Sequence, residues 1–124
     1  MESIISKKLI MAYQPTIDND SVSALPAARF GGRIVVVDDD NMVEAACHDL
    51  RRYAMIGFDT ETRPSFRAGV SYKVSLLQLS TPEVCYLFRL CSIRLSNALL
   101  KILGSRQILK VGVDVGGDIR ALQA

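Results

Sequence analysis

Runs of apolar residues, alternating or continuous, divide the chain into regular elements from residue 33 onward. The β-branched run Arg33–Val37 predicts a buried strand. Further strands are predicted over Ala54–Asp59, Lys73–Ser80, Val84–Arg89 and Gln107–Gly112. The middle three have short links, which favours an antiparallel meander.

Helical spacing of apolar residues predicts helices between these strands. They cover Met42–Tyr53, Asn97–Leu103 up to Gly104, and Asp118–Ala124 after two glycines. A meander followed by a helix and another strand indicates an α/β fold. We expect one mixed sheet, the three-strand antiparallel meander plus a further parallel strand, flanked by helices.

Residues 1–31 follow no such pattern, and we expect them to form an N-terminal extension ahead of a single domain over residues 32–124. Ser3–Met11 has the spacing of a short amphipathic helix, whereas the composition of Asp18–Ser23 favours turn or loop. We expect the last predicted helix, which has no stop signal, to be cut by the end of the chain.

Composition narrows the function only slightly. The net charge is +2 and 49% of the residues are hydrophobic, so charge neither supports nor excludes a polyanionic substrate. No segment approaches the roughly 18 to 20 apolar residues of a membrane span, and no signal peptide is evident, so we expect a cytoplasmic protein without membrane contacts.

The positions of the cysteines, the histidine and an acidic triplet favour structural roles over metal binding. Cys47, Cys85 and Cys91 form no CxxC pair, so a zinc site is improbable and reduced core thiols are expected. His48 is expected to be solvated or to cap a helix. Asp38-Asp39-Asp40 invites a metal-site hypothesis, but its place before a helix favours capping.

Asp59 and Glu61 carry the most informative chemistry. They lie at the end of a hydrophobic strand, and alternate residues of a strand project from one face. Two neighbouring carboxylates repel each other unless a cation compensates them. Magnesium or manganese suits that need because both prefer oxygen ligands.

Asp118 is the third candidate. It follows the strand over Gln107–Gly112, and if that strand runs beside Ala54–Asp59, Asp118 approaches the first two acids at the sheet edge. The alternative is that Asp118 only caps the final helix.

The segments IGFDTET (56–62) and KVGVDVGGDIRAL (110–122) resemble the first two motifs of the DEDD superfamily of 3′-to-5′ exonucleases, in the branch of ribonuclease D and the Werner syndrome exonuclease. KVSLLQLST (73–81) is similar to the family's next strand. The resemblance runs from about Gly32 to the end of the chain. It implies a DnaQ-like, ribonuclease H-like fold whose C-terminal part is missing.

The resemblance also implies a mechanism. Asp59, Glu61 and Asp118 would be catalytic and metal-binding, together with a fourth acid from a third motif that contains a Tyr or His four residues before an Asp. Two Mg²⁺ or Mn²⁺ ions in the complete site would drive hydrolysis to nucleoside 5′-monophosphates. The third motif is not found before Ala124, so we expect this chain to be a truncated and impaired exonuclease domain.

Single-stranded or 3′-recessed nucleic acid is the expected partner. Basic residues with an aromatic among them follow the acidic strand and could meet a phosphate backbone and stack on a base, although a solvated surface loop is the alternative. We assign nucleic-acid contacts to Thr60, Thr62, Arg63, Phe66 and Arg67.

Two other functions compete with this one. A non-catalytic nucleic-acid-binding domain of the same fold would bind oligonucleotides without divalent ions. A phosphate loop at Gly116-Gly117 is disfavoured, because the sequence lacks both GxGxxG and GxxxxGK[ST]. The sequence decides neither DNA against RNA nor the oligomeric state.

Overall fold

The computed structural model describes residues 14–123, and its contacts divide the chain into two units, Met1–Phe30 and Gly31–Ala124. The helix predicted at Ser3–Met11 lies outside the described residues. In the first unit, α2 (Asn19–Ala24) occupies a segment for which turn or loop was predicted, and that prediction is wrong. The Asp18 carboxylate accepts a hydrogen bond from the Ser21 N–H at 2.7 Å, which starts the helix and lowers the pKa of Asp18.

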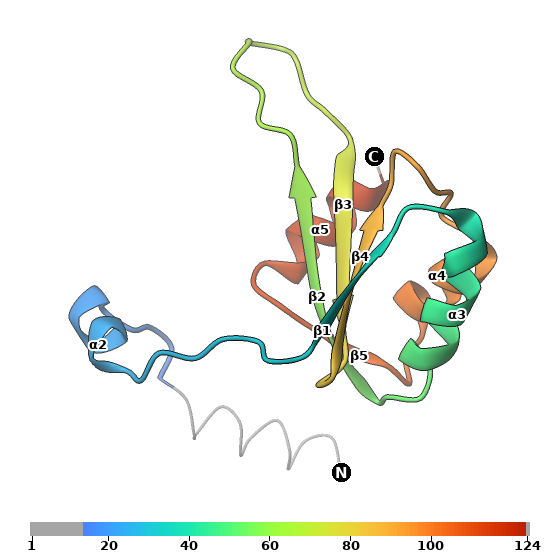
Figure 1. Ribbon diagram of the computed structural model, residues 1–124. Coiled ribbons are helices and arrows are strands. Elements are labelled where there is room, and N and C mark those ends of the chain that lie inside the picture. Colours follow the sequence, from blue (N-terminus) through green and yellow to red (C-terminus); the bar gives the residue numbers. More distant parts are fainter. Residues whose placement is uncertain (1–13, 124) are drawn as a thin grey trace. The chain divides into compact units, whose positions relative to one another are not determined.

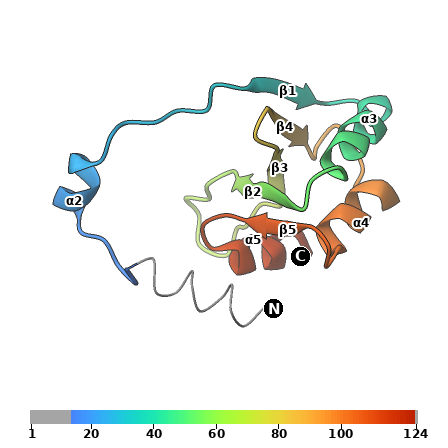
Figure 2. The same cartoon turned by 90° about the horizontal axis from the view of Figure 1, so that it is seen from below.

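The second unit is built on one mixed five-stranded sheet (Figures 1 and 2). Its meander and its additional parallel strand confirm the predicted topology: β2, β3 and β4 are antiparallel neighbours, and β5 runs parallel to β2. The strands in spatial order are β1 (Arg33–Val37), β4 (Val84–Arg89), β3 (Val74–Ser80), β2 (Met55–Thr62) and β5 (Leu109–Val111).

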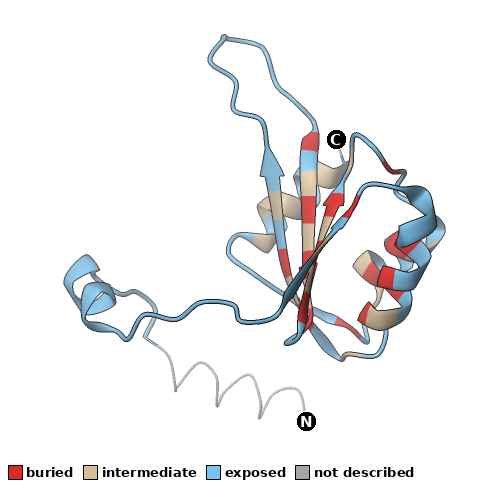
Figure 3. Cartoon of the chain, viewed as in Figure 1, coloured by how far each residue is buried: buried red, intermediate tan, exposed pale blue. Residues whose placement is uncertain are grey.

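The strand β1 is not the buried strand that its β-branched run predicted. It pairs only with β4, in parallel, so it forms one edge of the sheet. Ile34 is 62% exposed and Val36 44%, whereas Val37 is fully buried. Most of this strand therefore has the pale blue of exposed residues in Figure 3. The prediction was wrong because apolar runs do not distinguish a central strand from an edge strand with one covered face.

Two helices, α3 (Asp40–Leu50) and α4 (Asn97–Gly104), cover one face of the sheet (Figure 1). Asp39 caps α3 by accepting a hydrogen bond from the Asn41 N–H at 2.8 Å, as capping predicted. The largest fully buried side chains come from both layers: Leu50, Ile56, Leu77, Leu79, Phe88, Leu99 and Ile102. Within residues 14–123, no helix is long and apolar enough to cross a bilayer.

The opposite face of the sheet carries the alternate residues of each strand. The pairings Ile34↔Cys85, Ser80↔Gly57 and Gly57↔Val111 trace one continuous face across all five strands. Met55, Leu109 and Val111 on this face are 48–59% exposed. Asp59 and Glu61 belong to the same face, because they lie two and four residues beyond Gly57.

The three cysteines occupy different environments. Cys47 is fully buried, and burial raises the pKa of its thiol to about 11. Cys85 is half-buried, and burial also raises its pKa. Cys91 is exposed, so the prediction of three core thiols is wrong for this residue. His48 is exposed in the last turn of α3, as predicted.

A hydrogen bond from the Tyr86 hydroxyl to the Asp49 carboxylate, at 2.6 Å, ties α3 to β4. We predict that Tyr86→Phe lowers the free energy of unfolding at neutral pH by about 1 kcal/mol, because one buried hydrogen bond is lost. Burial and this hydrogen bond raise the pKa of Tyr86 from 10.0 to about 12. The fold therefore favours the protonated phenol, whose contribution is complete below pH 10 and disappears as the pH rises through 12.

Both the loss of stability in Tyr86→Phe and its dependence on pH can be measured by urea denaturation. Wild type and Tyr86→Phe are compared at neutral pH and at a pH between 10.0 and about 12, the ordinary and the raised pKa of Tyr86. Tyr53→Phe is the control, since the Tyr53 hydroxyl makes no hydrogen bond within residues 14–123. Equal stability of Tyr86→Phe and wild type at neutral pH would show that the contact contributes nothing.

Candidate active site

The strand β2 presents the acidic residues in an alternating pattern. It runs to Thr62, three residues beyond the predicted end, because Asp59–Glu61 continues to pair with β3. Asp59 lies opposite Gln78 and Glu61 opposite Leu76, on the exposed face, whereas Thr60 lies opposite the buried Leu77. The two acids therefore share one face, and the threonine between them projects to the other.

A register shift interrupts the β2–β3 ladder immediately after Glu61. The Ser75 hydroxyl donates to the Glu61 carbonyl at 3.0 Å and holds the chain at this irregularity. Bulges of this kind redirect side chains at the ends of strands and are frequent beside active sites. The interruption fixes the backbone of Glu61 where the long β2–β3 loop leaves the sheet.

The helix α5 (Val115–Gln123) packs beside β2 beyond the end of the short strand β5. A side chain on Gly112 would collide with the Phe58 carbonyl oxygen, so glycine permits this close approach. Asp114, at a φ of 52°, starts the helix: its carbonyl accepts from the Asp118 N–H and its carboxylate from the Gly117 N–H. Gly116 and Gly117 thus lie inside α5, not before it as predicted.

Asp118 lies in the first turn of α5 and contacts the acidic segment of β2 through Thr60. The Thr60 hydroxyl donates to Asp118 Oδ1 at 2.7 Å. The other carboxylate oxygen, Oδ2, is buried and has no hydrogen-bond partner among residues 14–123. Asp118 is therefore not the helix cap of the alternative interpretation, because Asp114 has that place.

The structure brings Asp118 to the segment that carries Asp59 and Glu61, but through the threonine between them. Within residues 14–123, no three histidine, cysteine or acidic side chains lie together in a way that could hold a metal ion. Asp59 and Glu61 lie on one face of β2, and the Asp118 carboxylate bonds to a side chain that points to the other.

The donor set nevertheless fits a hard divalent cation. Asp59 and Glu61 offer exposed carboxylates on one strand face, and a buried carboxylate oxygen without a partner is costly unless a water or a cation satisfies it. Magnesium and manganese both prefer such oxygen ligands. A bound cation or water would therefore supply the partner that Asp118 Oδ2 lacks.

Of the other predicted contact residues, Thr62 ends β2, and Arg63, Phe66 and Arg67 lie on the β2–β3 loop, which extends beyond the sheet (Figure 1). Thr62, Arg63 and Arg67 are exposed, and Phe66 is 94% exposed. The Arg63 guanidinium lies 4.7 Å from the centre of the Tyr72 ring, a cation–π contact across the base of the loop. Thr60 is separate from this group, since its hydroxyl bonds to Asp118.

Sequence reasoning missed Tyr72, Ser75 and Asp114 as residues that shape the site. Asp-x-x-Gly at the start of a helix is a recognisable capping signal and could have identified Asp114. Tyr72 and Ser75 act through contacts across the hairpin, which local patterns do not contain. Lys110, on β5, donates to the Ser105 and Ile108 carbonyls at 2.7 and 2.8 Å, and burial lowers its pKa.

Comparison with known proteins identifies the fold and its family. The model of a 3′-5′ exonuclease family matches residues 34–124. A protein of Arabidopsis thaliana described as a 3′-5′ exonuclease is 32% identical over 105 residues, which cover 75% of this chain and 36% of that protein. The chain therefore belongs to the 3′-5′ exonuclease domain family.

Solved exonuclease structures have the same fold. The Nibbler exonuclease domain of Aedes aegypti superposes with a TM-score of 0.65 at 30% identity, over 73% of this chain and 43% of that one. The EXD2 exonuclease domain soaked in Mg and GMP gives 0.63 at 30% identity, over 73% and 50%. Trypanosoma brucei RNase D gives 0.63 at 24% identity, over 76% and 34%. The chain spans about a third to a half of the length of these relatives.

We predict that Thr60→Val lowers the free energy of unfolding by about 1 to 3 kcal/mol, because it leaves both oxygens of a partly buried carboxylate without a hydrogen-bond donor. Thr60→Ser keeps the hydroxyl and is the matched control. A double-mutant cycle with Asp118→Ala, which removes the acceptor, isolates the pair when measured by urea denaturation. Strictly additive losses would mean that the two side chains do not interact.

Proposed function

We propose that this chain carries the first two motifs of a 3′-to-5′ exonuclease that hydrolyses nucleic acid from its 3′ end to nucleoside 5′-monophosphates. The observation that carries the proposal is the contact of Asp118 with Thr60, which brings a partnerless carboxylate oxygen to the segment between Asp59 and Glu61. The family match over residues 34–124 supports the same reaction class.

Asp59, Glu61 and Asp118 would hold Mg²⁺ or Mn²⁺, two ions in the complete site, with a fourth acid from outside these residues. Bound ions of this kind lower the pKa of a water and stabilise the leaving 3′ oxygen. The similar EXD2 exonuclease domain, which was soaked in Mg and GMP, supports this choice of cation and of product class.

The residues of the chain have separable tasks in this proposal. Asp59 and Glu61 face a substrate from the open side of β2, while Thr60 orients Asp118 from behind the strand. Without cations, the three carboxylates repel a phosphodiester, so the site binds substrate only when it is loaded. Thr60 is therefore a positioning residue, and the three acids are the catalytic residues.

The β2–β3 loop would receive single-stranded or 3′-recessed nucleic acid next to this site. Thr62 ends β2 directly after the acidic segment, and Arg63, the first residue of the loop, is held against Tyr72. Phe66 is nearly fully exposed at the far part of the loop, where an unpaired base could stack on its ring. Arg67 adds a positive charge for the phosphate backbone.

We predict that Asp59→Ala reduces nucleotide release by at least about 100-fold, since even losing an outer partner of a metal ligand costs about 10- to 100-fold. The assay follows nucleoside 5′-monophosphate release from a single-stranded oligonucleotide with manganese. It uses this chain and an extended protein, in which an added C-terminal segment supplies the third motif of the family. Calorimetric titration with manganese, which we expect to lose its heat of binding in Asp59→Ala, gives a second readout.

Asp38→Asn is the matched control, because Asp38 is an exposed carboxylate outside the candidate site. We expect it to leave both readouts unchanged. If the extended protein releases no nucleotide, and oligonucleotide binding ignores manganese and survives Asp59→Ala, the chain is a non-catalytic nucleic-acid-binding domain.

We predict that Phe66→Ala weakens binding of a single-stranded oligonucleotide by about 1 to 3 kcal/mol, the value of one base–aromatic stack. Because the Phe66 side chain is 94% exposed, we expect the free energy of unfolding of Phe66→Ala to stay within about 0.5 kcal/mol of wild type. Val70→Ala in the same loop is the control and Phe66→Trp the rescue. Fluorescence anisotropy measures the affinity, and unchanged binding by Phe66→Ala would place the stacking surface elsewhere.

A further inference from the structure

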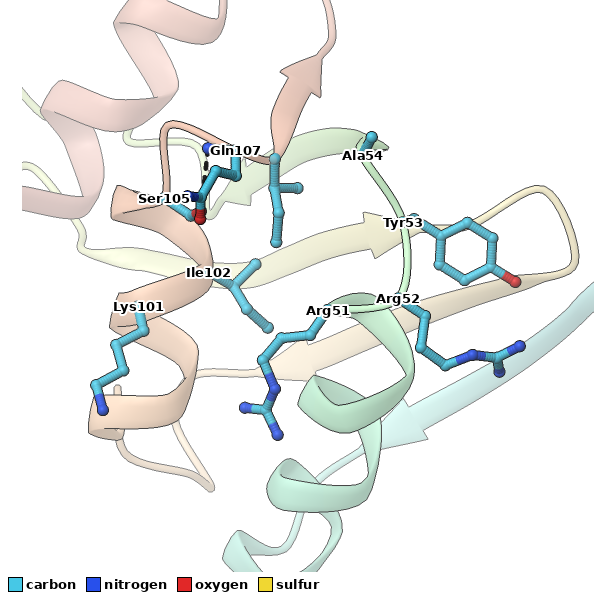
Figure 4. A pocket seen from close by; sticks show the side chains of 9 residues that line it. Arg51, Arg52, Tyr53, Ala54, Lys101, Ile102, Ser105 and Gln107 are labelled. Carbon is cyan, nitrogen blue, oxygen red and sulfur yellow. Dashed lines mark hydrogen bonds between the residues drawn. The ribbon is translucent and has the colours of Figure 1, made fainter.

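A cavity of about 420 Å³ lies between the C-terminal ends of α3 and α4. Its apolar wall consists of Ala54, Ile102 and Ile108. Arg51 and Arg52, which directly follow α3, and Lys101 of α4 line it together with Ser105 and Gln107 (Figure 4). Cationic and amide donors therefore surround a recess with an apolar wall, and none of these residues belongs to the candidate active site.

Positive residues are common at helix C-termini, where they offset the dipole and cap free carbonyls. Here that task is already performed. The Arg51 and Tyr53 N–H groups bond to the carbonyls of Cys47 and Leu50 at the end of α3. The Ser105 N–H bonds to the Ile102 carbonyl at the end of α4. The side chains of Arg51 and Lys101 are thus not needed as caps.

The acidic neighbours neutralise the cavity only partly. Arg52 pairs with Asp49 at 3.1 Å and is committed to its own helix. The Arg51 guanidinium lies 3.4 Å from the Glu44 carboxylate. The Glu44 side chain is 72% exposed, and ion pairs exposed to this degree contribute little. Lys101 forms no ion pair within residues 14–123. Arg51 and Lys101 extend toward the same side of the cavity (Figure 4).

We propose that Arg51 and Lys101 form a second binding site for the phosphodiester backbone of a nucleic acid. This proposal rests on the nucleic-acid substrate proposed above. The guanidinium forms a planar fork and the ammonium a point charge, a combination suited to phosphate oxygens. The apolar wall accepts the sugar.

The place of the cavity in the fold determines which substrates use it. Ala54 lines the cavity and immediately precedes β2, so Asp59 lies five residues further along the strand, about 17 Å at about 3.3 Å per residue. The cavity lies on the face covered by α3 and α4, and Asp59 lies on the opposite face, so a short oligonucleotide in the active site does not reach the cavity. Only a strand long enough to pass around the sheet edge reaches both. The cavity thus adds affinity for long substrates, which offsets the repulsion from the acidic site.

The test compares oligonucleotide binding by wild type and by Arg51→Gln/Lys101→Gln, measured by fluorescence anisotropy over a range of salt concentrations. For a long single strand we expect about tenfold weaker binding and a salt slope smaller by about 1.4, at about 0.7 per phosphate contact. For a trinucleotide we expect no change. Glu44→Gln, which frees Arg51, strengthens binding of the long strand.

Arg94→Gln is the matched control. This exposed cation lies just before the N-terminal end of α4, whereas the cavity lies at the C-terminal end. If Arg94→Gln weakens binding of the long strand as much as Lys101→Gln does, the effect of charge is general and the proposal is overturned. Equal losses of affinity for the trinucleotide and the long strand would also overturn it. Unchanged binding of the long strand would overturn it too. None of these results depends on nucleotide release, so a failure of the proposed hydrolysis is seen separately.

Discussion

The hydrogen bond between Thr60 and Asp118 joins the two parts of the chain that carry its acidic chemistry. It depends on the alternation of β2, which directs Thr60 away from the face of Asp59 and Glu61. It also depends on Gly112, whose missing side chain lets α5 approach the Phe58 carbonyl, and on Asp114, which starts the helix. A buried carboxylate oxygen without a partner is the result of this packing.

The sequence predicted the elements whose signals are local. β4 was predicted with its observed bounds, because turn residues delimit it on one side and an apolar alternation fills it. β2 was predicted to end at Asp59, since polar residues lower strand propensity, but pairing with β3 extends it to Thr62. The shared face of Asp59 and Glu61 follows from the period of a strand alone.

Other features arise only from tertiary packing. The exposure of Ile34 and Val36 depends on the position of β1 at the sheet edge, which its composition does not encode. The contact between Thr60 and Asp118 joins residues 58 positions apart in the sequence. Sequence reasoning brought Asp118 to the acidic strand by topology but did not foresee that a threonine hydroxyl would bind its carboxylate.

The acidic residues of β2 and the basic residues around the cavity have opposite effects on a polyanionic substrate. The chain carries a net charge of only +2, and the candidate site itself repels a polyanion. Cations at Asp59, Glu61 and Asp118, with positive side chains on the β2–β3 loop and around the cavity, would allow a phosphate backbone to approach.

Titration of the isotope-labelled protein with Mn²⁺, followed by paramagnetic broadening of backbone amide signals, tests most directly whether Asp59, Glu61 and Asp118 share a cation. The account predicts that the amides of Asp59–Glu61 and of Gly117-Asp118 broaden together at the lowest Mn²⁺ concentrations. Broadening centred on Asp38–Asp40, or confined to one of the two segments, would contradict it.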